Sequence, residues 1–211
     1  MQRAWYSSKA WLQRQARDPY VKAAKSNQFR ARSAFKLIQL DQKYKLIKRG
    51  SVVVDVGAAP GGFTQVAVNK GATVIGVDLL PIEPIPNAHL IQGDFTKPSI
   101  QKTIMDALEG RPVDLVCSDM APSFSGNHTA DHARSMELCE AVFAFAETVL
   151  AQNGSMVTKL LMGGDEVHFR KKLKARFRLV KQEKPDASRK QSTEIFIVAK
   201  GYKKDMKKEE V

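Results

Sequence analysis

The sequence Val54-Asp-Val-Gly-Ala-Ala-Pro-Gly-Gly-Phe63 leads from an apolar run into a loop that contains three glycines. The apolar run begins at Ser51 and predicts a buried strand, whereas residues 62–70 predict a helix. Glycines at such a strand-to-helix turn let the backbone bend sharply and approach a ligand closely. This stretch therefore predicts the first unit of a wound α/β sheet, with a ligand site at its loop.

Strands and helices are expected to alternate along the rest of the chain. We expect strands at 73–78, 88–92, 113–119, 155–161, 177–181 and 194–199, and helices at 20–46, 99–108, 130–151 and 164–175. The last two strands are separated only by the loop 184–193, which is too short for a helical crossover, so they should pair antiparallel. The expected fold is α/β and Rossmann-like, with a seven-stranded, mostly parallel sheet and an antiparallel last strand. That arrangement is typical of methyltransferases rather than of dinucleotide-binding proteins.

Charge is distributed unevenly along the 211 residues, which are 43% hydrophobic and suit one domain with a full core. Residues 1–50 carry 13 Lys or Arg and two acids, residues 51–158 carry 5 and 12, and residues 159–211 carry 16 and 8. An acidic middle between basic flanks predicts a face that binds a polyanion, and nucleic acid is the one favoured.

Other classes of protein are disfavoured by what the sequence lacks. No segment approaches the roughly 20 apolar residues of a membrane span. The two cysteines, Cys117 and Cys139, have neither metal-site nor disulfide spacing. We therefore expect a soluble monomer of a reducing compartment, without a metal and without membrane association. His128 and His132 are four residues apart in a polar stretch and are interpreted as solvated surface.

Acidic residues are expected at or near the ends of the first four strands: Asp55, Asp78, Asp94 and Asp119. A dinucleotide site would need a GxGxxG loop for the pyrophosphate, but here Pro60 interrupts the loop and Asp55 would repel a diphosphate. S-adenosylmethionine instead carries a sulfonium, an ammonium and a ribose diol. Asp78 can accept both ribose hydroxyls and Asp94 the adenine amino group. Singly, each Asp is as well explained as a helix cap or turn residue, but the set predicts an S-adenosylmethionine site.

Three further charged residues stand in apolar surroundings. Lys159 interrupts an expected buried strand, Lys36 lies in an apolar helix, and Glu194 begins the last strand. A lysine buried in a strand costs free energy unless it is paired or functional. Asp119 ends the neighbouring strand, so a charge pair between Asp119 and Lys159 is geometrically reasonable.

The motifs, taken in order, resemble the FtsJ-like (RlmE) family of ribose 2′-O-methyltransferases, whose bacterial member modifies a uridine of large-subunit ribosomal RNA. The matching segments begin at Arg32, Asp55, Asp78, Gln92, Ser118, Lys184 and Ser192, and they span residues 17 to 200 in the family's order. Residues 17–25 look most similar to mitochondrial members.

The resemblance implies an S-adenosylmethionine-dependent rRNA (uridine-2′-O-)-methyltransferase with a catalytic tetrad of Lys36, Asp119, Lys159 and Glu194. It places cofactor contacts on Gly61, Phe63, Asp78, Asp94 and Asp119. Two positions depart from the family pattern. Phe63 replaces a tryptophan, and the turn Leu160-Leu-Met-Gly-Gly164 is less polar than usual, which puts local substrate contacts in doubt.

The expected mechanism is an in-line transfer of a methyl group to a ribose hydroxyl. That hydroxyl is a weak nucleophile, so it needs a base or a cation beside the developing alkoxide. We assign this role to Lys159, oriented by Asp119, with Lys36 and Glu194 positioning the hydroxyl. As a base, Lys159 must be uncharged part of the time.

RNA contacts are expected from the basic flanks, and the partner is large-subunit rRNA or an assembling large subunit. The residues are Arg30, Arg32, Lys184, Arg189 and Lys190. Residues 1–17 are basic and free of acids, which is typical of a mitochondrial presequence or of an RNA-binding arm with stacking aromatics. The expected organisation is an arm or presequence at 1–17, a methyltransferase domain at 18–203 and a charged tail at 204–211. The expected location is the mitochondrion, with the bacterial cytoplasm as the alternative.

Two other functions stay open on the sequence. The same fold and tetrad serve a methyltransferase of transfer RNA or of an mRNA cap, because the tetrad specifies the chemistry and not the RNA. A non-catalytic ribosome assembly factor is the other alternative, although a binding protein has no use for a lysine inside a buried strand.

Overall fold

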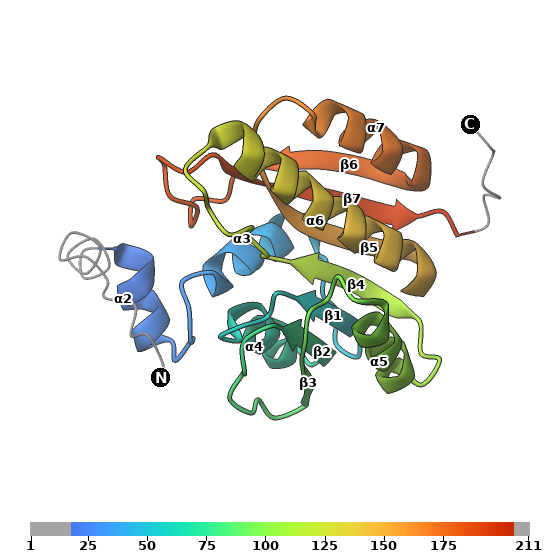
Figure 1. Ribbon diagram of the computed structural model, residues 1–211. Helices are drawn as coiled ribbons and strands as arrows, with labels where there is room; N and C mark the ends of the chain where they lie inside the picture. Colours follow the sequence, from blue (N-terminus) through green and yellow to red (C-terminus); the bar gives the residue numbers. More distant parts are fainter. Residues whose placement is uncertain (1–17, 205–211) are drawn as a thin grey trace.

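The computed structural model describes residues 18–204 and contains one seven-stranded sheet (Figure 1). The strands are β1 (Val52–Val56), β2 (Thr73–Asp78), β3 (Ala88–Gln92), β4 (Val113–Ser118), β5 (Leu150–Leu161), β6 (Phe177–Glu183) and β7 (Glu194–Tyr202). Their order across the sheet is β3-β2-β1-β4-β5-β7-β6. The first five strands are parallel, and β7 runs antiparallel to both β5 and β6. The expected Rossmann-like sheet with its antiparallel last strand is confirmed.

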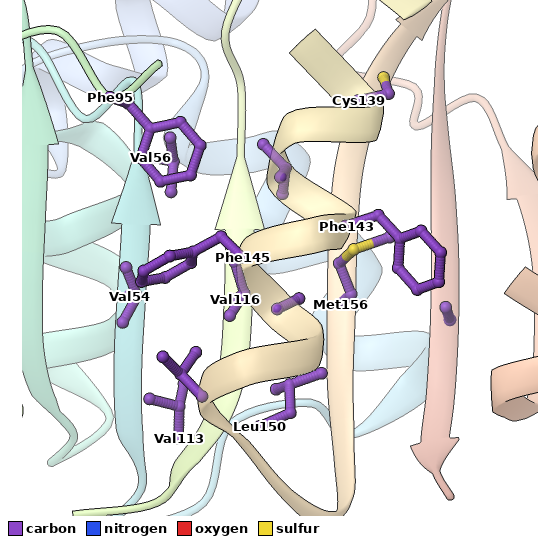
Figure 2. Close-up of a cluster of buried hydrophobic side chains, with 14 of the residues drawn as sticks. Val54, Val56, Phe95, Val113, Val116, Cys139, Phe143, Phe145, Leu150 and Met156 are labelled. Carbon is purple, nitrogen blue, oxygen red and sulfur yellow. The ribbon is translucent and has the colours of Figure 1, made fainter. Parts of the chain in front are cut away.

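Helices cover both faces of the sheet. One face packs against α3 (Ala34–Tyr44) and α4 (Gly62–Asn69), and the other packs against α5 (Pro98–Leu108), α6 (His128–Val149) and α7 (Glu166–Arg176). Figure 2 shows the second of these layers, where Phe143 and Phe145 of α6 project toward valines of β1 and β4 and toward Met156 of β5. Because two apolar layers enclose the central strands, polar side chains concentrate at the ends of the strands.

The expected single helix over residues 20–46 is wrong. The structure has two helices, α2 (Pro19–Ser26) and α3, joined by residues 27–33. Helix α2 ends at the cap Asn27, and Gln28 follows with a φ of 59°, so the backbone leaves the helical path there. Strand β5 also begins earlier than expected, at Leu150 rather than at 155, with an irregular register beside Val113.

The expected domain limits stay a prediction. The arm at 1–17 and almost the whole tail at 204–211 lie outside the described residues. Within the described part, no helix is both long and apolar enough to cross a bilayer.

Asp55 of β1 is an acid buried inside this framework, with 1% of its surface exposed. Its carboxylate accepts a hydrogen bond of 2.7 Å from the Thr64 hydroxyl at the start of α4, and the Cys117 thiol lies 3.8 Å away. Burial raises the pKa of Asp55 to about 7, and the negative charge of Asp119 acts in the same direction. The folded protein therefore holds a proton here that the unfolded chain releases near pH 4.

This proton makes a testable contribution to stability. Because the folded state binds more protons than the unfolded state between about pH 4 and 7, Asp55 lowers the free energy of unfolding as pH rises through that window. Asp55→Asn cannot ionise, so its stability relative to wild type should improve from pH 5 to pH 8, by at most about 3 kcal/mol. Urea unfolding across this pH range measures the difference, with Asp106→Asn on the exposed face of α5 as the control. A difference between Asp55→Asn and wild type that does not change with pH would contradict the assignment.

Candidate functional site

The four tetrad residues come together at the edge of the sheet where the parallel strands end. Lys36 projects from α3, Asp119 directly follows β4, Lys159 lies in β5 and Glu194 begins β7. Because β5 and β7 are antiparallel neighbours, with Lys159 opposite Phe196 and Leu161 opposite Glu194, their two charged side chains reach the same edge.

The Asp119 carboxylate is the centre of this group. The same carboxylate oxygen, Oδ1, lies 3.0 Å from Lys159 Nζ and 3.3 Å from Lys36 Nζ. Lys159 also donates a hydrogen bond of 2.5 Å to the backbone carbonyl of Asp119. Lys36 makes a second ion pair of 2.9 Å with Glu194. Two lysines thus face two carboxylates, and all four side chains are at most 16% exposed.

The ionisation of Glu194 reflects this pairing. Burial pushes the pKa of Glu194 upward, but the positive charge of Lys36 and the hydrogen bond from it outweigh that effect. The pKa of Glu194 is therefore held below its ordinary value. Glu194 remains an anion at neutral pH, and its carboxylate holds Lys36 Nζ at 2.9 Å.

A cavity of about 280 Å³ adjoins the tetrad on the side of β1, β2 and β4. We call it the cofactor cavity. Its lining includes three carboxylates, from Asp78, Asp94 and Asp119, and no lysine or arginine. An acidic lining disfavours a diphosphate and suits a ligand that carries a sulfonium and an ammonium. The residues present therefore fit S-adenosylmethionine.

Backbone hydrogen bonds fix two of these carboxylates. One oxygen of Asp78 accepts from the Ala59 N–H and the other from the Leu80 N–H, both at 2.9 Å. One oxygen of Asp94 accepts from the Thr96 hydroxyl at 2.7 Å and from its N–H at 3.0 Å, which keeps the pKa of Asp94 below its ordinary value. A carboxylate has about four acceptor positions, so both residues retain capacity for ligand hydroxyl or amino groups.

Gly61 and Phe63, expected as cofactor contacts, do not line this cavity. Phe63 is 3% exposed and packs against Phe196 in the core, with ring centroids 6.3 Å apart. Gly61 precedes α4 with a φ of 114°, and a Cβ there would lie 2.7 Å from Ile85. Their direct contact with a cofactor stays a prediction, and the structure places Gly61 at the turn into α4 and Phe63 in the core.

Arg30, expected to bind RNA, ties together the two loops that border the cofactor cavity. Its guanidinium donates to the carbonyls of Pro60 at 3.2 Å, Glu83 at 2.6 Å and Pro84 at 2.8 Å. Pro60 belongs to the glycine loop, and the other two carbonyls belong to the loop between β2 and β3. Nothing in the sequence marks an arginine for this task, because its three acceptors are backbone atoms that only the fold brings together.

The other four expected RNA residues gather around the loop between β6 and β7. Arg32 pairs with Asp18 at 3.1 Å and donates to the carbonyl of Ala187 at 2.8 Å. Within the loop, Lys184 donates to two carbonyls, whereas Arg189 lies 3.8 Å from Asp18 and Lys190 is exposed. The loop and its cations lie next to Glu194. RNA binding by these residues stays a prediction.

The interpretation of His132 as solvated surface is wrong. Helix α6 begins at His128, and its first turns place His132 against the end of β5, with 4% of its surface exposed. Its Nδ1 lies 2.6 Å from the carbonyl of Leu161, and the Asp165 N–H donates to Nε2 at 3.3 Å. His128 is exposed as expected. Among residues 18–204, no group of three or more potential ligands is arranged to hold a metal ion.

Comparison with known proteins gives concordant matches. The model of the FtsJ-like methyltransferase family matches residues 29–202. The chain is 52% identical to the ribosomal RNA large subunit methyltransferase E of Acidiphilium cryptum over 94% of this chain and 88% of the relative. It is 48% identical to the protein of that name from Gluconobacter oxydans, over 92% and 72%. A crystal structure of a ribosomal RNA methyltransferase from Plasmodium falciparum superimposes with a TM-score of 0.75 at 31% identity, covering 82% of this chain and 98% of that one.

The geometry of the cofactor cavity predicts two separable effects on ligand affinity. Asp78→Ala removes a carboxylate that lines the cavity and should weaken S-adenosylmethionine binding by roughly 1–3 kcal/mol, the usual cost of unmet hydrogen bonds. Arg30→Ala should weaken S-adenosylmethionine binding by a smaller factor, because the two loops that border the cavity lose the hydrogen bonds that connect them. Arg111→Ala is the matched control, since Arg111 also donates to backbone carbonyls but at the far end of α5. Calorimetric titration measures all three, and equal affinity of the two arginine variants would contradict the proposed role of Arg30.

Proposed function

The chain belongs to the FtsJ-like methyltransferase family, and from this premise we propose that it methylates the 2′-hydroxyl of a uridine ribose in large-subunit ribosomal RNA. The methyl donor is S-adenosylmethionine. The observation that carries the proposal is the tetrad beside an acidic cavity, with Asp119 belonging to both.

Lys159 is the residue that we propose to activate the ribose hydroxyl. Its amine nitrogen makes two hydrogen bonds, to the carboxylate and to the carbonyl of Asp119. A neutral amine has two N–H bonds and one lone pair. With both N–H groups held by Asp119, the lone pair of neutral Lys159 is directed away from Asp119 and can accept the hydroxyl proton. In the charged form, the third N–H would instead stabilise the developing alkoxide.

Lys36 and Glu194 act on the charge of the site in this proposal. Lys36 shares the carboxylate oxygen of Asp119 with Lys159, so one carboxylate oxygen is the counter-charge for both lysines. Glu194 pairs with Lys36 and so balances the positive charge that Lys36 brings to the site. The 2′-oxygen would receive the methyl group as the bond between that methyl group and the sulfonium sulfur breaks, which would leave a neutral thioether, and the hydroxyl proton would pass to Lys159.

The cofactor would be held by the carboxylates of Asp78, Asp94 and Asp119. Bound there, S-adenosylmethionine supplies an electrophilic methyl group on a sulfonium centre. Asp78 suits the ribose diol, and Asp94 suits the adenine amino group. Backbone N–H groups orient both oxygens of Asp78 and one oxygen of Asp94. Asp119 lines the cavity and contacts Lys159, so it links the donor side to the acceptor side.

The choice of RNA rests on the relatives and on charge. The relatives from A. cryptum and G. oxydans are named as large-subunit ribosomal RNA methyltransferases. The loop between β6 and β7, which begins beside Glu183 and ends at Glu194, supplies Lys184, Arg189 and Lys190 next to the tetrad. We take this loop as the phosphate-binding part of the site and the protein as a monomer that acts on rRNA or on an assembling large subunit.

The location of the protein is a separate proposal. A mitochondrial location depends on residues 1–17, which lie outside the described residues. The relatives from A. cryptum and G. oxydans are bacterial, which favours the bacterial cytoplasm, the alternative considered from the sequence. Fusion of residues 1–17 to a fluorescent protein distinguishes the two, because a presequence directs import into mitochondria.

Two substitutions at Lys159 test the catalytic proposal. Lys159→Ala should lower the rate of methyl transfer by at least the ~10²–10⁴-fold that general base catalysis contributes, with S-adenosylmethionine affinity little changed. Lys159→Arg should be almost as slow, because a guanidinium stays charged and cannot accept the proton. Single-turnover methylation of rRNA measures both. Substantial activity in Lys159→Arg would show that Lys159 acts only by its positive charge.

A second prediction concerns the basic loop. The double substitution of Arg189 and Lys190 by alanine removes one half-buried and one exposed cation. The slope of log K for RNA against log salt should therefore fall by roughly 0.7–0.9 per lost phosphate contact. Affinity for S-adenosylmethionine should not change. Binding titrations at several salt concentrations measure the slope, and an unaltered slope would exclude this loop from the RNA face.

A further inference from the structure

A second cavity, of about 180 Å³, lies at the same edge of the sheet as the tetrad. Its walls come from Phe124 and Gly126 in the loop after β4, from His128 and Asp131 in the first turn of α6, from Leu161 and Met162 at the end of β5, and from Thr193 before β7. It shares no lining residue with the cofactor cavity.

The walls of this second cavity come from the segments that carry the tetrad. Phe124 follows Asp119 by five residues, Leu161 follows Lys159 by two, and Thr193 directly precedes Glu194. The backbone of Met162 donates to the carbonyl of Thr193 at 3.1 Å, which closes the wall between β5 and β7. The tetrad therefore has the cofactor cavity on one side and the second cavity close by on another.

The second cavity exposes large apolar side chains. Phe124 is 67% exposed and Met162 is 45% exposed. Exposed apolar groups that gather around a cavity are typical of a binding site. A single six-membered ring fits here, since an apolar cavity of about 150 Å³ already holds benzene.

The loop that presents Phe124 is fixed in place by Asp131 of α6. The Asp131 carboxylate accepts hydrogen bonds from the N–H and the hydroxyl of Ser125, both at 2.9 Å, and from the N–H of Gly126 at 3.3 Å. Arg134 pairs with the same carboxylate. Phe124 is thus held at the surface by a braced loop, although burying its ring would be favourable. An aromatic ring that is held in a solvent-exposed position is preorganised for stacking on a base.

From these observations we propose that the second cavity binds the base of the nucleotide whose 2′-hydroxyl is methylated, with Phe124 stacking on the base and Met162 completing the apolar wall. This inference rests on the proposed function. The hydroxyl has to be reached from the cofactor cavity, so the remainder of the nucleotide must lie elsewhere around the tetrad. The second cavity offers the apolar side chains of Phe124, Leu161 and Met162 there, beside the polar groups of His128, Asp131 and Thr193. The loop between β6 and β7 offers cations for phosphates.

Stacking on an unpaired base sets the size of the expected effect. One base stacked on an aromatic side chain is worth about 1–3 kcal/mol, so Phe124→Ala should weaken RNA binding between about fivefold and a hundredfold. Phe124→Trp should restore binding, because the indole also stacks. Met162→Ala should cause a smaller loss. Met105→Ala is the matched control, since Met105 is 41% exposed on α5, away from the tetrad.

The test combines affinity with the site of crosslinking. Large-subunit rRNA transcribed with 4-thiouridine is bound to the wild-type protein and irradiated, and the crosslinked peptides are identified by mass spectrometry. We expect crosslinks in residues 121–128 and 160–163, lost in Phe124→Ala and kept in Met105→Ala. Crosslinks that map only outside these segments, or wild-type affinity in Phe124→Ala, would overturn the inference.

The same measurement separates this inference from the proposed function. Binding and crosslinking need no methyl transfer, so their outcome is independent of the activity of wild type and of Lys159→Ala. If Phe124→Ala binds and methylates rRNA like wild type while Lys159→Ala is inactive, the base-binding role is wrong and the methyltransferase stands. If wild type crosslinks at the second cavity and does not methylate RNA, the base-binding role stands and the catalytic proposal is wrong.

Discussion

The carboxylate of Asp119 receives two lysines on one oxygen, and the arrangement of the whole site follows from that contact. Lys36 comes from a helix on one face of the sheet, and Lys159 comes from a strand at its centre. Holding both ammonium groups within 3.3 Å of Asp119 requires the end of β4, the end of β5 and the start of α3 to meet. A buried ammonium group is costly unless an opposite charge lies beside it, so both contacts favour this one arrangement of the three elements. The fold therefore has to keep these three elements in register.

The antiparallel β7 supplies what a purely parallel sheet would not. A parallel neighbour of β5 would begin at the opposite edge, so its first residue could not reach the tetrad. Because β7 runs the other way, its first residue, Glu194, lies beside the end of β5. The loop from β6 to β7 consequently arrives at the catalytic edge with its cations. Cofactor cavity, tetrad, basic loop and second cavity all lie at one edge for this topological reason.

Much of this could be predicted from the sequence, and the part that could not has a common physical cause. The alternation of apolar strands with amphipathic helices indicated the sheet. Lys159, a lysine inside an apolar strand, indicated the site. The same reasoning joined α2 and α3 into one helix, because the break at Gln28 depends on a backbone conformation that no residue type requires. It also assigned His132 to solvent, and it did not foresee that Arg30 ties two loops together. Both side chains bond to backbone carbonyls from distant segments, and such acceptors carry no sequence signature.

We propose above all that the tetrad performs ribose methylation of large-subunit rRNA. The most direct measurement is a map of 2′-O-methylation across cellular RNAs from cells that lack this gene, complemented with wild type or with Asp119→Asn. We predict that one uridine of large-subunit rRNA loses its methyl group, regains it with wild type and does not regain it with Asp119→Asn. An unchanged large-subunit rRNA together with a lost methyl group in transfer RNA or at an mRNA cap would contradict the claim.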